Sequence, residues 1–404
     1  MIRKCPYAAE SSPQDDPCAD YLRLSEGPAV LREDVLDVWV VTGFNEVTAL
    51  LRNPAMSSAW PAHANTTLHD GSISLEGPTR TDDTVRRWFM FNDGDQHMKL
   101  RRLVAPLFSA QQLAAFQPHI EDLVTRLLDG KHDRLDIVKD VSVPLSSGVI
   151  CRLLGMPGEV ARSLAEWGQD IAALLYADYL PEVVERGHRA LRGLEGVVRE
   201  ALARPELPDD SGLGLLRRAR LAGEIDERDI LSVASLLVYA GFETTSVFIG
   251  KAVRSALHAD LWSQLGGPGN ASMVEELLRF DTSVRQVARV AMSDVVIGGH
   301  RIAEGELVLL MLGAANRDGE VFDEPDHLLE ERRIRRHLAF GQGPHYCLGA
   351  GLARLEVQIV LRQLVAKWDA VELVTAPVVK RHFGVPVLES LEIRPVRTRA
   401  STSR

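Results

Sequence analysis

The chain has 404 residues, of which 46% are hydrophobic and 25% are charged, a composition typical of a globular protein. Its formal net charge of -10 argues against nucleic acid as a partner. The four cysteines form no CxxC pair, which disfavours a disulfide framework or a cysteine-rich zinc module and favours a reducing cytoplasm.

Helical periodicity marks most of the first 280 residues. Before it begins, "WVVTG" (39–43) is typical of a strand, and residues 60–92 lack a clean period and predict a long loop. The predicted helices are, in chain order, 45–54, 95–109, the nearly continuous stretch 111–265 with breaks at 157–158 and 204–212, and 271–280.

Strands are expected mainly towards the C-terminus. Residues 289–312 are rich in apolar and β-branched residues, and "GGH" (298–300) predicts a hairpin turn between two of their strands. A further helix is predicted from Gly349, and residues 370–396 alternate like short strands.

Together these elements predict a mainly α fold with small β-sheets. One apolar stretch, 230–250, is long enough to span a bilayer, but Glu243 and Thr244 lie at its middle, where a carboxylate is costly in lipid. We therefore predict a core helix and no membrane association. We expect one domain over 1–404, with two flexible ends, 1–16 and 397–404.

One cysteine stands in a glycine-rich stretch, "FGQGPHYCLG" (340–349). A zinc site is disfavoured because no other Cys or close His completes a set of four ligands around Cys347. A phosphate-binding loop is disfavoured because Tyr346 stands where GxGxxG requires glycine. A nucleophilic thiol and an inert buried thiol both stay open.

The neighbours of Cys347 favour a further role. Gly341 and Gly343 permit unusual backbone conformations and a close approach to a flat group, and Pro344 stiffens the loop. The helix predicted after Cys347 would stabilise a thiolate through its free N–H groups and its dipole. A rigid loop that offers a charged sulfur to a flat group is what an axial haem ligand requires.

The loop resembles the FGxGxHxCxG signature of the cytochrome P450 haem-thiolate monooxygenases, which specifies six of these ten positions. The resemblance extends over nearly the whole chain, from about residue 17 to 396. It implies the cytochrome P450 fold, with a long central helix over the haem, and haem b as the cofactor. It also implies that Cys347 ligates the iron, Phe340 shields the sulfur and His345 bonds a haem propionate.

The stretch "AGFETTS" (240–246) resembles the central-helix motif of the same family. Gly241 removes bulk from the helix face that also carries Thr244, and a threonine hydroxyl can bond the carbonyl four residues earlier. The resemblance implies a groove for O₂ here, with Glu243 and Thr244 relaying protons. Without the cysteine loop, a core helix with a buried polar pair is the simpler interpretation.

Glu276 and Arg279 lie three residues apart on a predicted helix, a spacing that usually indicates a surface ion pair. The resemblance implies instead that this pair is buried and that Arg332 joins it. The segment before Arg332 departs from the family pattern, because Leu328 and Leu329 stand where Phe and Asp are common.

His97 and Arg101 lie four residues apart, on one face of a predicted helix. The resemblance implies that both bond haem propionates and that Arg289, in "RVA", does so too. Before this helix the chain has "NDGDQH" where the family commonly has a proline pair, so the entry to the helix is expected to differ.

The resemblance implies an enzyme that activates O₂ with two electrons and oxidises, typically hydroxylates, a mainly apolar small molecule such as a secondary metabolite. The chain has no flavin or nicotinamide motif, so we expect a ferredoxin or similar donor and its reductase as partners. The basic segment 331–337 is the expected docking face. We also expect a cytoplasmic monomer.

Two rival functions stay open. The same haem oxidant could perform ring coupling, C–N bond formation or desaturation, and a different class would be a haem sensor or electron carrier. Apolar residues near the expected cavity are candidates for substrate contact, although core packing explains each equally well; they are Trp60, Trp88, Val238, Phe242, Val284, Val287 and Val385.

Overall fold

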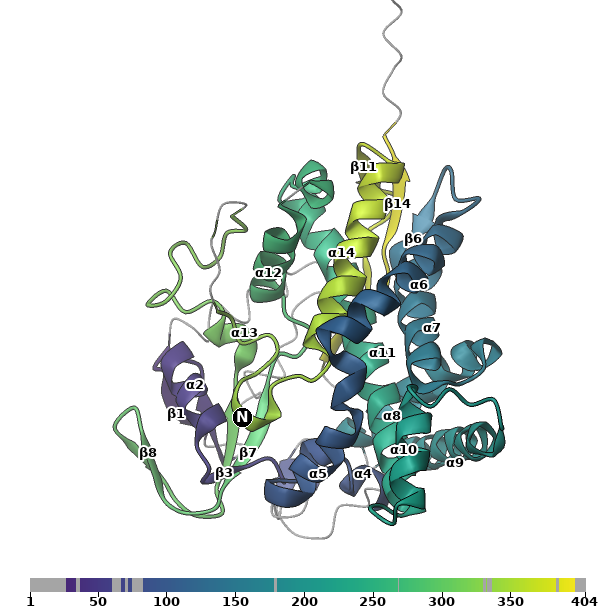
Figure 1. The fold of residues 1–404 in the computed structure, drawn as a ribbon. Helices are drawn as coiled ribbons and strands as arrows, with labels where there is room; N and C mark the ends of the chain where they lie inside the picture. Colours follow the sequence, from purple (N-terminus) through teal and green to yellow (C-terminus); the bar gives the residue numbers. More distant parts are fainter. Residues whose placement is uncertain are drawn as a thin grey trace, which may run out of the picture.

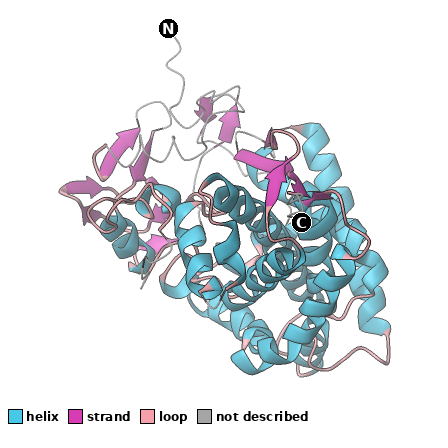
Figure 2. Cartoon of the chain, turned by 90° about the horizontal axis from the view of Figure 1, so that it is seen from above, coloured by secondary structure: helices cyan, strands magenta, loops and turns pink. Residues whose placement is uncertain are grey.

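In the computed structural model, helices form the larger part of the molecule and the strands form several separate small sheets (Figures 1 and 2). The structure describes residues 27–33, 37–59, 67–69, 72–74, 83–177, 180–267, 269–329, 332, 336–382 and 385–396. Its helices are α2 (Phe44–Arg52), α4 (Asp83–Arg86), α5 (Gly94–Val104), α6 (Ala110–Leu128), α7 (Val143–Leu154), α8 (Ala161–Ala177), α9 (Pro181–Ala203), α10 (Gly212–Leu221), α11 (Glu227–His258), α12 (Asn270–Phe280), α13 (Leu312–Ala315) and α14 (Ala350–Lys367).

The largest sheet has five strands in the order β1-β2-β10-β7-β3, in which only the β2–β10 pair is parallel. The β8–β9 hairpin turns through Gly298 and Gly299, both with positive φ, as the "GGH" signal predicted. The strands are β1 (Val30–Glu33), β2 (Val38–Val41), β3 (Met56–Ser57), β4 (Thr67–His69), β5 (Ser72–Ser74), β6 (Leu135–Asp136), β7 (Val287–Ala291), β8 (Val295–Ile297), β9 (His300–Ile302), β10 (Leu307–Leu310), β11 (Val371–Leu373), β12 (Val378–His382), β13 (Val385–Ser390) and β14 (Glu392–Pro395).

Helix α11 runs through the middle of the helical part and contacts α7, α8, α12 and α14 (Figure 1). It begins with a capping box, in which the side chains of Asp226 and Asp229 each accept a hydrogen bond from the other's backbone N–H. It is long and apolar enough to cross a membrane, but 67% of its most apolar 18-residue stretch is buried inside the protein. The predicted core helix is therefore confirmed.

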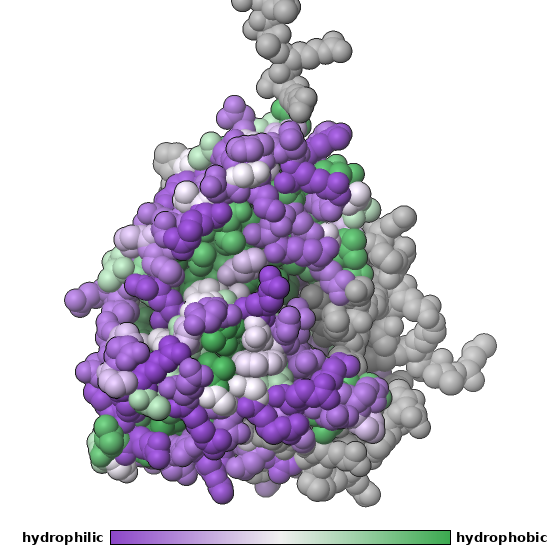
Figure 3. Space-filling view, turned by 90° about the vertical axis from the view of Figure 1, so that its right-hand side faces the viewer, coloured by the Kyte–Doolittle hydropathy of each residue, from purple (hydrophilic) through white to green (hydrophobic). Residues whose placement is uncertain are grey.

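Two main hydrophobic clusters lie under these elements. The larger is formed by the helices around α11, and the second lies between α2 and the five-stranded sheet, with Phe44, Val47 and Leu310 among its buried members. The face seen in Figure 3 is largely hydrophilic, with apolar patches between the polar ones. The segments that carry the candidate site pass between these two clusters.

The prediction of a mainly α fold with small sheets is confirmed. The nearly continuous helix predicted over 111–265 is wrong at 222–226, between α10 and α11, and at 129–142, where β6 and a π-helix, Ile137–Ser142, interrupt it. At 129–142 the cause is partly long-range: β6 pairs with β14, and the Asp136 carboxylate accepts hydrogen bonds from the N–H groups of Val138 and Lys139. Within the predicted loop 60–92, the described residues form β4, β5, α4 and a short 3₁₀ turn. The predicted flexible ends lie outside the described residues.

Candidate active site

The cysteine loop, residues 340–349, is a tight turn that packs against α2. Gly341 and Gly343 adopt φ values of 64° and 72°, which disfavour other residue types. A Cβ atom on Gly343 would lie 2.5 Å from the carbonyl oxygen of Leu51, whereas one on Gly341 would meet nothing within 4 Å. The N–H of Cys347 donates to the carbonyl of Phe340 at 2.9 Å and closes the loop. Gly343 therefore permits a close approach to protein backbone, a contact that the sequence pattern did not indicate.

The thiol of Cys347 is free and is reached by solvent. Protein atoms nevertheless surround it closely enough that burial raises the pKa of the thiol above its ordinary value, although hydrogen bonds from the N–H groups of Gly349 and Ala350 and the nearby cations Arg101 and Arg354 act to lower it. The helix start that we predicted to stabilise a thiolate is thus present, but burial has the larger effect on the pKa of the thiol. By contrast, Cys151 is buried in the core, where burial raises its thiol pKa to about 12.

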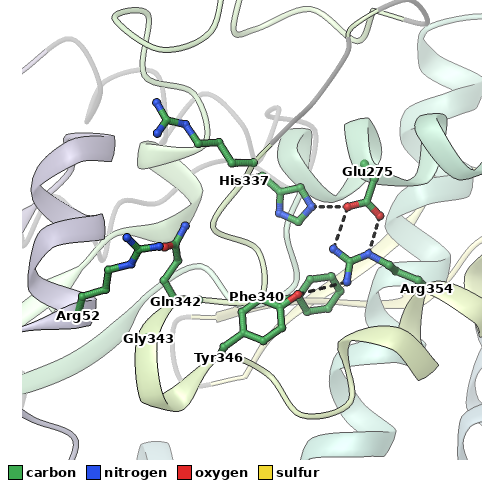
Figure 4. Close-up of a pocket in the computed structure, with 10 residues that line it drawn as sticks. Arg52, Glu275, His337, Phe340, Gln342, Gly343, Tyr346 and Arg354 are labelled. Carbon is green, nitrogen blue, oxygen red and sulfur yellow. Dashed lines mark hydrogen bonds and ion pairs between the residues drawn. The ribbon is translucent and has the colours of Figure 1, made fainter. Parts of the chain in front are cut away.

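Beside the loop, a charged network holds the ring of Phe340 (Figure 4). The Arg354 guanidinium lies 4.4 Å from the centroid of this ring and donates to both Glu275 oxygens at 2.6 and 2.8 Å. The Nε2 atom of His337 lies 3.1 Å from Glu275. Burial alone would raise the pKa of Glu275, but hydrogen bonds from His337 and Arg354 lower it to about 2.

A cavity of about 360 Å³ opens next to this network. It lies between α2 and the cysteine loop, and its polar lining is predominantly basic (Figure 4). Among its lining residues are Arg52, Glu275, Arg336, His337, Tyr346 and Arg354.

The four residues predicted to hold propionates do gather around the cysteine loop. The rings of His97 and His345 lie 4.1 Å apart between centroids, and Arg101 donates to the carbonyl of Tyr346 at 2.6 Å. The Nε2 atom of His97 lies 3.2 Å from the carbonyl oxygen of Pro344. Helix α5, which carries His97 and Arg101, is thereby joined directly to the loop.

Asp93 is a member of this cluster that the sequence reasoning missed. Its carboxylate lies 3.0 Å from Nε2 of His345 and accepts hydrogen bonds from the hydroxyls of Ser57 and Ser58. Burial would raise the pKa of Asp93, but these hydrogen bonds hold it well below its usual range. Asp93 stands in "NDGDQH", and it could have been noticed there only as the residue that precedes a helix.

Arg289 is the most deeply buried cation of the cluster, with 7% of its surface exposed. Its guanidinium donates a hydrogen bond to the neighbouring carbonyl of Ala288 at 2.8 Å, and the negative charge of Asp93 acts on it. Burial lowers its pKa to about 10. A buried guanidinium without a bonded carboxylate is suited to an anionic partner.

These observations test whether the site suits a haem. An accessible free thiol stands on a rigid loop, and beside it Arg101, Arg289, His97 and His345 form a cationic and hydrogen-bonding surface of the kind that two carboxylates require. In the described part of the chain, no three His, Cys, Asp or Glu side chains are grouped to hold a metal ion. The residues present therefore fit a haem with one cysteine ligand.

The middle of α11 has an open face at the predicted oxygen groove. Ala240 is exposed although it lies within the core helix, and the hydroxyl of Thr244 donates to its carbonyl at 2.9 Å, as the spacing suggested. Burial raises the pKa of Glu243 to about 7. A Cβ atom on Gly241 would lie 2.2 Å from Cδ1 of Ile150 in α7, so the glycine also serves helix packing.

Glu276 and Arg279 form a buried pair, with 1% and 0% of their surfaces exposed. The guanidinium donates to both carboxylate oxygens at 2.8 Å, and Arg332 donates to Glu276 at 3.0 Å. The backbone N–H of Leu329 also donates to Glu276 at 3.1 Å. Because a backbone group makes this hydrogen bond, it does not depend on the Leu329 side chain, which departs from the family pattern. The spacing alone would suggest a surface ion pair, whereas the structure has a buried one.

The residues suggested for substrate contact fall in different places. Trp88 is fully buried, donates to Ser235 at 2.9 Å and stacks on Tyr239 at 5.0 Å between centroids. Val238 and Phe242 are buried on α11, and Val284 and Val287 pack against the second core cluster. Trp60 lies outside the described residues, as does the side chain of Val385. Contact of any of the seven with a substrate stays a prediction.

Comparisons with known proteins agree with this geometry. The family model "Cytochrome P450" matches residues 271–382. Cytochrome P450-SU2 of Streptomyces griseolus is 35% identical over 87% of this chain and 86% of its own length, and 6-deoxyerythronolide B hydroxylase of Saccharopolyspora erythraea is 32% identical over 83% and 84%. The mycinamicin VIII C21 methyl hydroxylase of Micromonospora griseorubida, solved bound to mycinamicin VIII, has a TM-score of 0.82 at 27% identity, over 95% of this chain and 98% of that one.

The fold and these matches define a class, the monooxygenases built on a mainly helical frame with a cysteine loop. The chain belongs to the cytochrome P450 family. Haem is the cofactor that membership of this family implies.

The contact between the cysteine loop and α2 leads to a first prediction. Gly343→Ala should lower the free energy of unfolding by about 2–4 kcal/mol, because the new Cβ meets the Leu51 carbonyl and the positive φ is strained. Gly341→Ala, the matched control, carries only the strain of its φ, about 1–2 kcal/mol. Denaturant titration of both variants measures the difference, and equal losses would show that the contact with α2 is unimportant.

Proposed function

We propose that the protein is a haem-thiolate monooxygenase that holds haem b through Cys347 and oxidises, typically hydroxylates, a mainly apolar small molecule of secondary metabolism. We further propose that it works as a cytoplasmic monomer and takes its electrons from a ferredoxin. The observation that carries the proposal is the cysteine loop, in which a free, accessible thiol receives N–H groups from the start of α14 and faces two arginines. Haem bound there supplies the redox-active iron that activates O₂.

The chain's own residues would hold the cofactor by charge and shape. Arg101 and Arg289 would neutralise the propionates, and His97 and His345 would complete their hydrogen bonds. Phe340 would cover the Cys347 sulfur, and the Arg354 guanidinium, 4.4 Å from the centroid of its ring, would hold it in place. Thiolate ligation strengthens electron donation to the iron and favours cleavage of the O–O bond.

Glu243 and Thr244 would deliver protons. A carboxyl group whose pKa is about 7 is partly protonated at neutral pH, so Glu243 can donate a proton and be reloaded. The Thr244 hydroxyl is the adjacent group on the open face of α11, and in the structure its proton is directed to the carbonyl of Ala240. A small change of the Thr244 side chain would redirect that proton towards the predicted oxygen groove.

The relatives guide the choice of substrate. Their names include 6-deoxyerythronolide B hydroxylase and 20-oxo-5-O-mycaminosyltylactone 23-monooxygenase, which support oxidation of a secondary metabolite. Ring coupling, C–N bond formation and desaturation are alternative outcomes of the same oxidant. A haem sensor or electron carrier is disfavoured because these relatives are oxygenases. Screening macrolactones, fatty acids and aromatic metabolites for a spin-state shift of the Soret band selects a working ligand, and product analysis then separates hydroxylation from its alternatives.

The basic cavity beside Phe340 supports a docking site for an acidic electron donor. Arg52 and Arg336 are exposed at its lining, and complementary charge accelerates association more than it tightens binding. The arginines of 331–337 that first suggested this face include Arg333 and Arg335, which lie outside the described residues. The described lining therefore offers better positions for a test.

The ligand assignment predicts the outcome of cysteine replacement. Cys347→Ser should lose the red-shifted Soret band that a reduced thiolate-ligated haem gives with carbon monoxide, and with it the monooxygenase activity. Cys151→Ala should keep both, because Cys151 lies in the core. A thiolate band retained by Cys347→Ser, or the absence of haem from the purified wild-type protein, would contradict the proposal.

The raised pKa of Glu243 predicts a pH dependence. Because its carboxyl is protonated below about pH 7 and ionised above, product formation should fall as the pH rises through 7. Glu243→Gln should abolish this inflection and slow product formation by about tenfold to a hundredfold, whereas Glu243→Asp should keep an inflection. A wild-type profile that is flat between pH 6 and 8 (roughly one unit either side of the pKa) would exclude the role.

Charge reversal tests the docking face. The double variant Arg52→Glu, Arg336→Glu should slow reduction by ferredoxin by about tenfold or more at low salt, and the difference should shrink as salt screens the charges. Arg218→Glu on α10 is the control, since it reverses an exposed charge on the opposite side of the molecule (Figure 1). An unchanged rate at low salt in the double variant argues for another docking surface.

A further inference from the structure

The segment between α12 and β7, residues 281–286, lies against the middle of α11 and bonds to it directly. The hydroxyl of Ser283 donates to the backbone carbonyl of Thr244 at 2.8 Å. This bond comes from outside the helix, from a residue 39 positions away in the chain, and it reaches the turn that carries the proposed proton-delivery pair.

A buried ionic cluster anchors the same segment two helical turns further along α11. Lys251, seven residues after Thr244, donates to Asp281 at 2.9 Å and to the carbonyl of Thr282 at 2.9 Å. Arg254 donates to the other Asp281 oxygen at 2.7 Å. The side chains of Lys251 and Asp281 are 5% and 1% exposed, so neither partner can leave without exposing the other's charge to an apolar interior.

The segment is also held near both of its ends by residues outside α11. The Arg317 guanidinium donates twice to the carbonyl of Phe280, at 2.7 and 3.1 Å, and the N–H of Gly313 donates to the carbonyl of Arg285 at 3.0 Å. Ser283 is therefore held between anchors before and after it. Its hydroxyl therefore restrains the Thr244 carbonyl of α11 from a position that other contacts fix.

Two hydroxyl groups thus act on backbone carbonyls one turn apart in α11. Thr244 bonds the Ala240 carbonyl, and Ser283 bonds the carbonyl of Thr244 itself. Hydroxyl groups that compete for helix carbonyls tilt them outwards and bend the helix locally. The orientation of the Thr244 side chain follows from the tilt of its own peptide group.

We propose that Ser283 is a positioning residue: through its hydrogen bond to the Thr244 carbonyl, the anchored segment 281–286 fixes the turn of α11 that presents Thr244 to the reacting oxygen. This inference rests on the proposed function. When the turn is held, two electrons and two protons reduce one atom of O₂ to water, and the other oxygen atom is transferred to the substrate. When it is loosened, the same electrons and protons leave with O₂ as H₂O₂.

The first arm of the test measures the helix turn itself. In the holoenzyme, Ser283→Ala should accelerate amide hydrogen exchange of a peptide covering 242–250 by roughly fivefold, the effect of one lost hydrogen bond of ordinary strength. Ser283→Thr should restore the wild-type rate. Ser147→Ala is the control, because its hydroxyl also bonds a helix carbonyl, that of Val143 at 2.8 Å, but on α7. Unchanged exchange in Ser283→Ala would overturn the proposal.

The second arm measures the fate of the electrons, with the working ligand from the spin-state screen as substrate. Ser283→Ala should release a severalfold larger share of the electrons supplied by ferredoxin as H₂O₂, with KM for that ligand unchanged, and Ser283→Thr should reverse the increase. Thr244→Ala separates the two ideas. If it raises H₂O₂ release but Ser283→Ala does not, the inference is wrong and the proposed role of Thr244 stands. If Thr244→Ala leaves H₂O₂ release unchanged, the proposed role of Thr244 fails, and the positioning role of Ser283 fails with it.

Discussion

The buried pair of Glu276 and Arg279 is the interaction on which the position of the site depends. Besides bonding Glu276, the guanidinium donates to the carbonyls of Asn316, Pro325 and His327, which belong to the segment that leads into the cysteine loop. Removing one partner of such a pair costs about 3–5 kcal/mol, since the other charge is left buried. The pair therefore links α12 to the chain that presents Cys347, and no apolar substitute could bond so many carbonyls.

The site concentrates positive charge within a protein whose formal net charge is -10. Arg101 and Arg354 act on the Cys347 thiol, and Arg289 acts on His345 of the same loop. Among the described residues, only Arg354 of these three has a carboxylate bonded to it, that of Glu275. A buried guanidinium such as Arg289 is stable only beside negative charge. This excess of cations is the physical reason that the site suits an anionic cofactor and a thiolate together.

The central helix α11 contributes through polar and exposed groups on one of its faces. Its interior is apolar and well packed, yet one face carries an exposed Ala240, a Glu243 whose pKa is raised by burial, and two carbonyls engaged by hydroxyl groups. Such features weaken a helix in isolation. They persist here because α7, α12 and the segment 281–286 hold the helix in place, which lets a rigid scaffold carry the polar turn that we propose delivers protons.

The sequence alone determined the helical class and the long central helix, because both depend on periodicity. It also brought the cysteine loop and the pairs at 97/101, 243/244 and 276/279 to notice by spacings of a few residues, while the roles expected of those pairs came from the family resemblance. It did not reveal that Gly343 meets the Leu51 carbonyl, that Asp93 binds His345, or that Ser283 reaches Thr244. It also missed the break at 135–142, where β6 pairs with β14 and a π-helix follows. Those contacts join residues far apart in the chain, and only tertiary packing brings them together. The tertiary structure also decided that Glu276 and Arg279 are buried, since the same spacing on an exposed helix face would have made an ordinary surface ion pair.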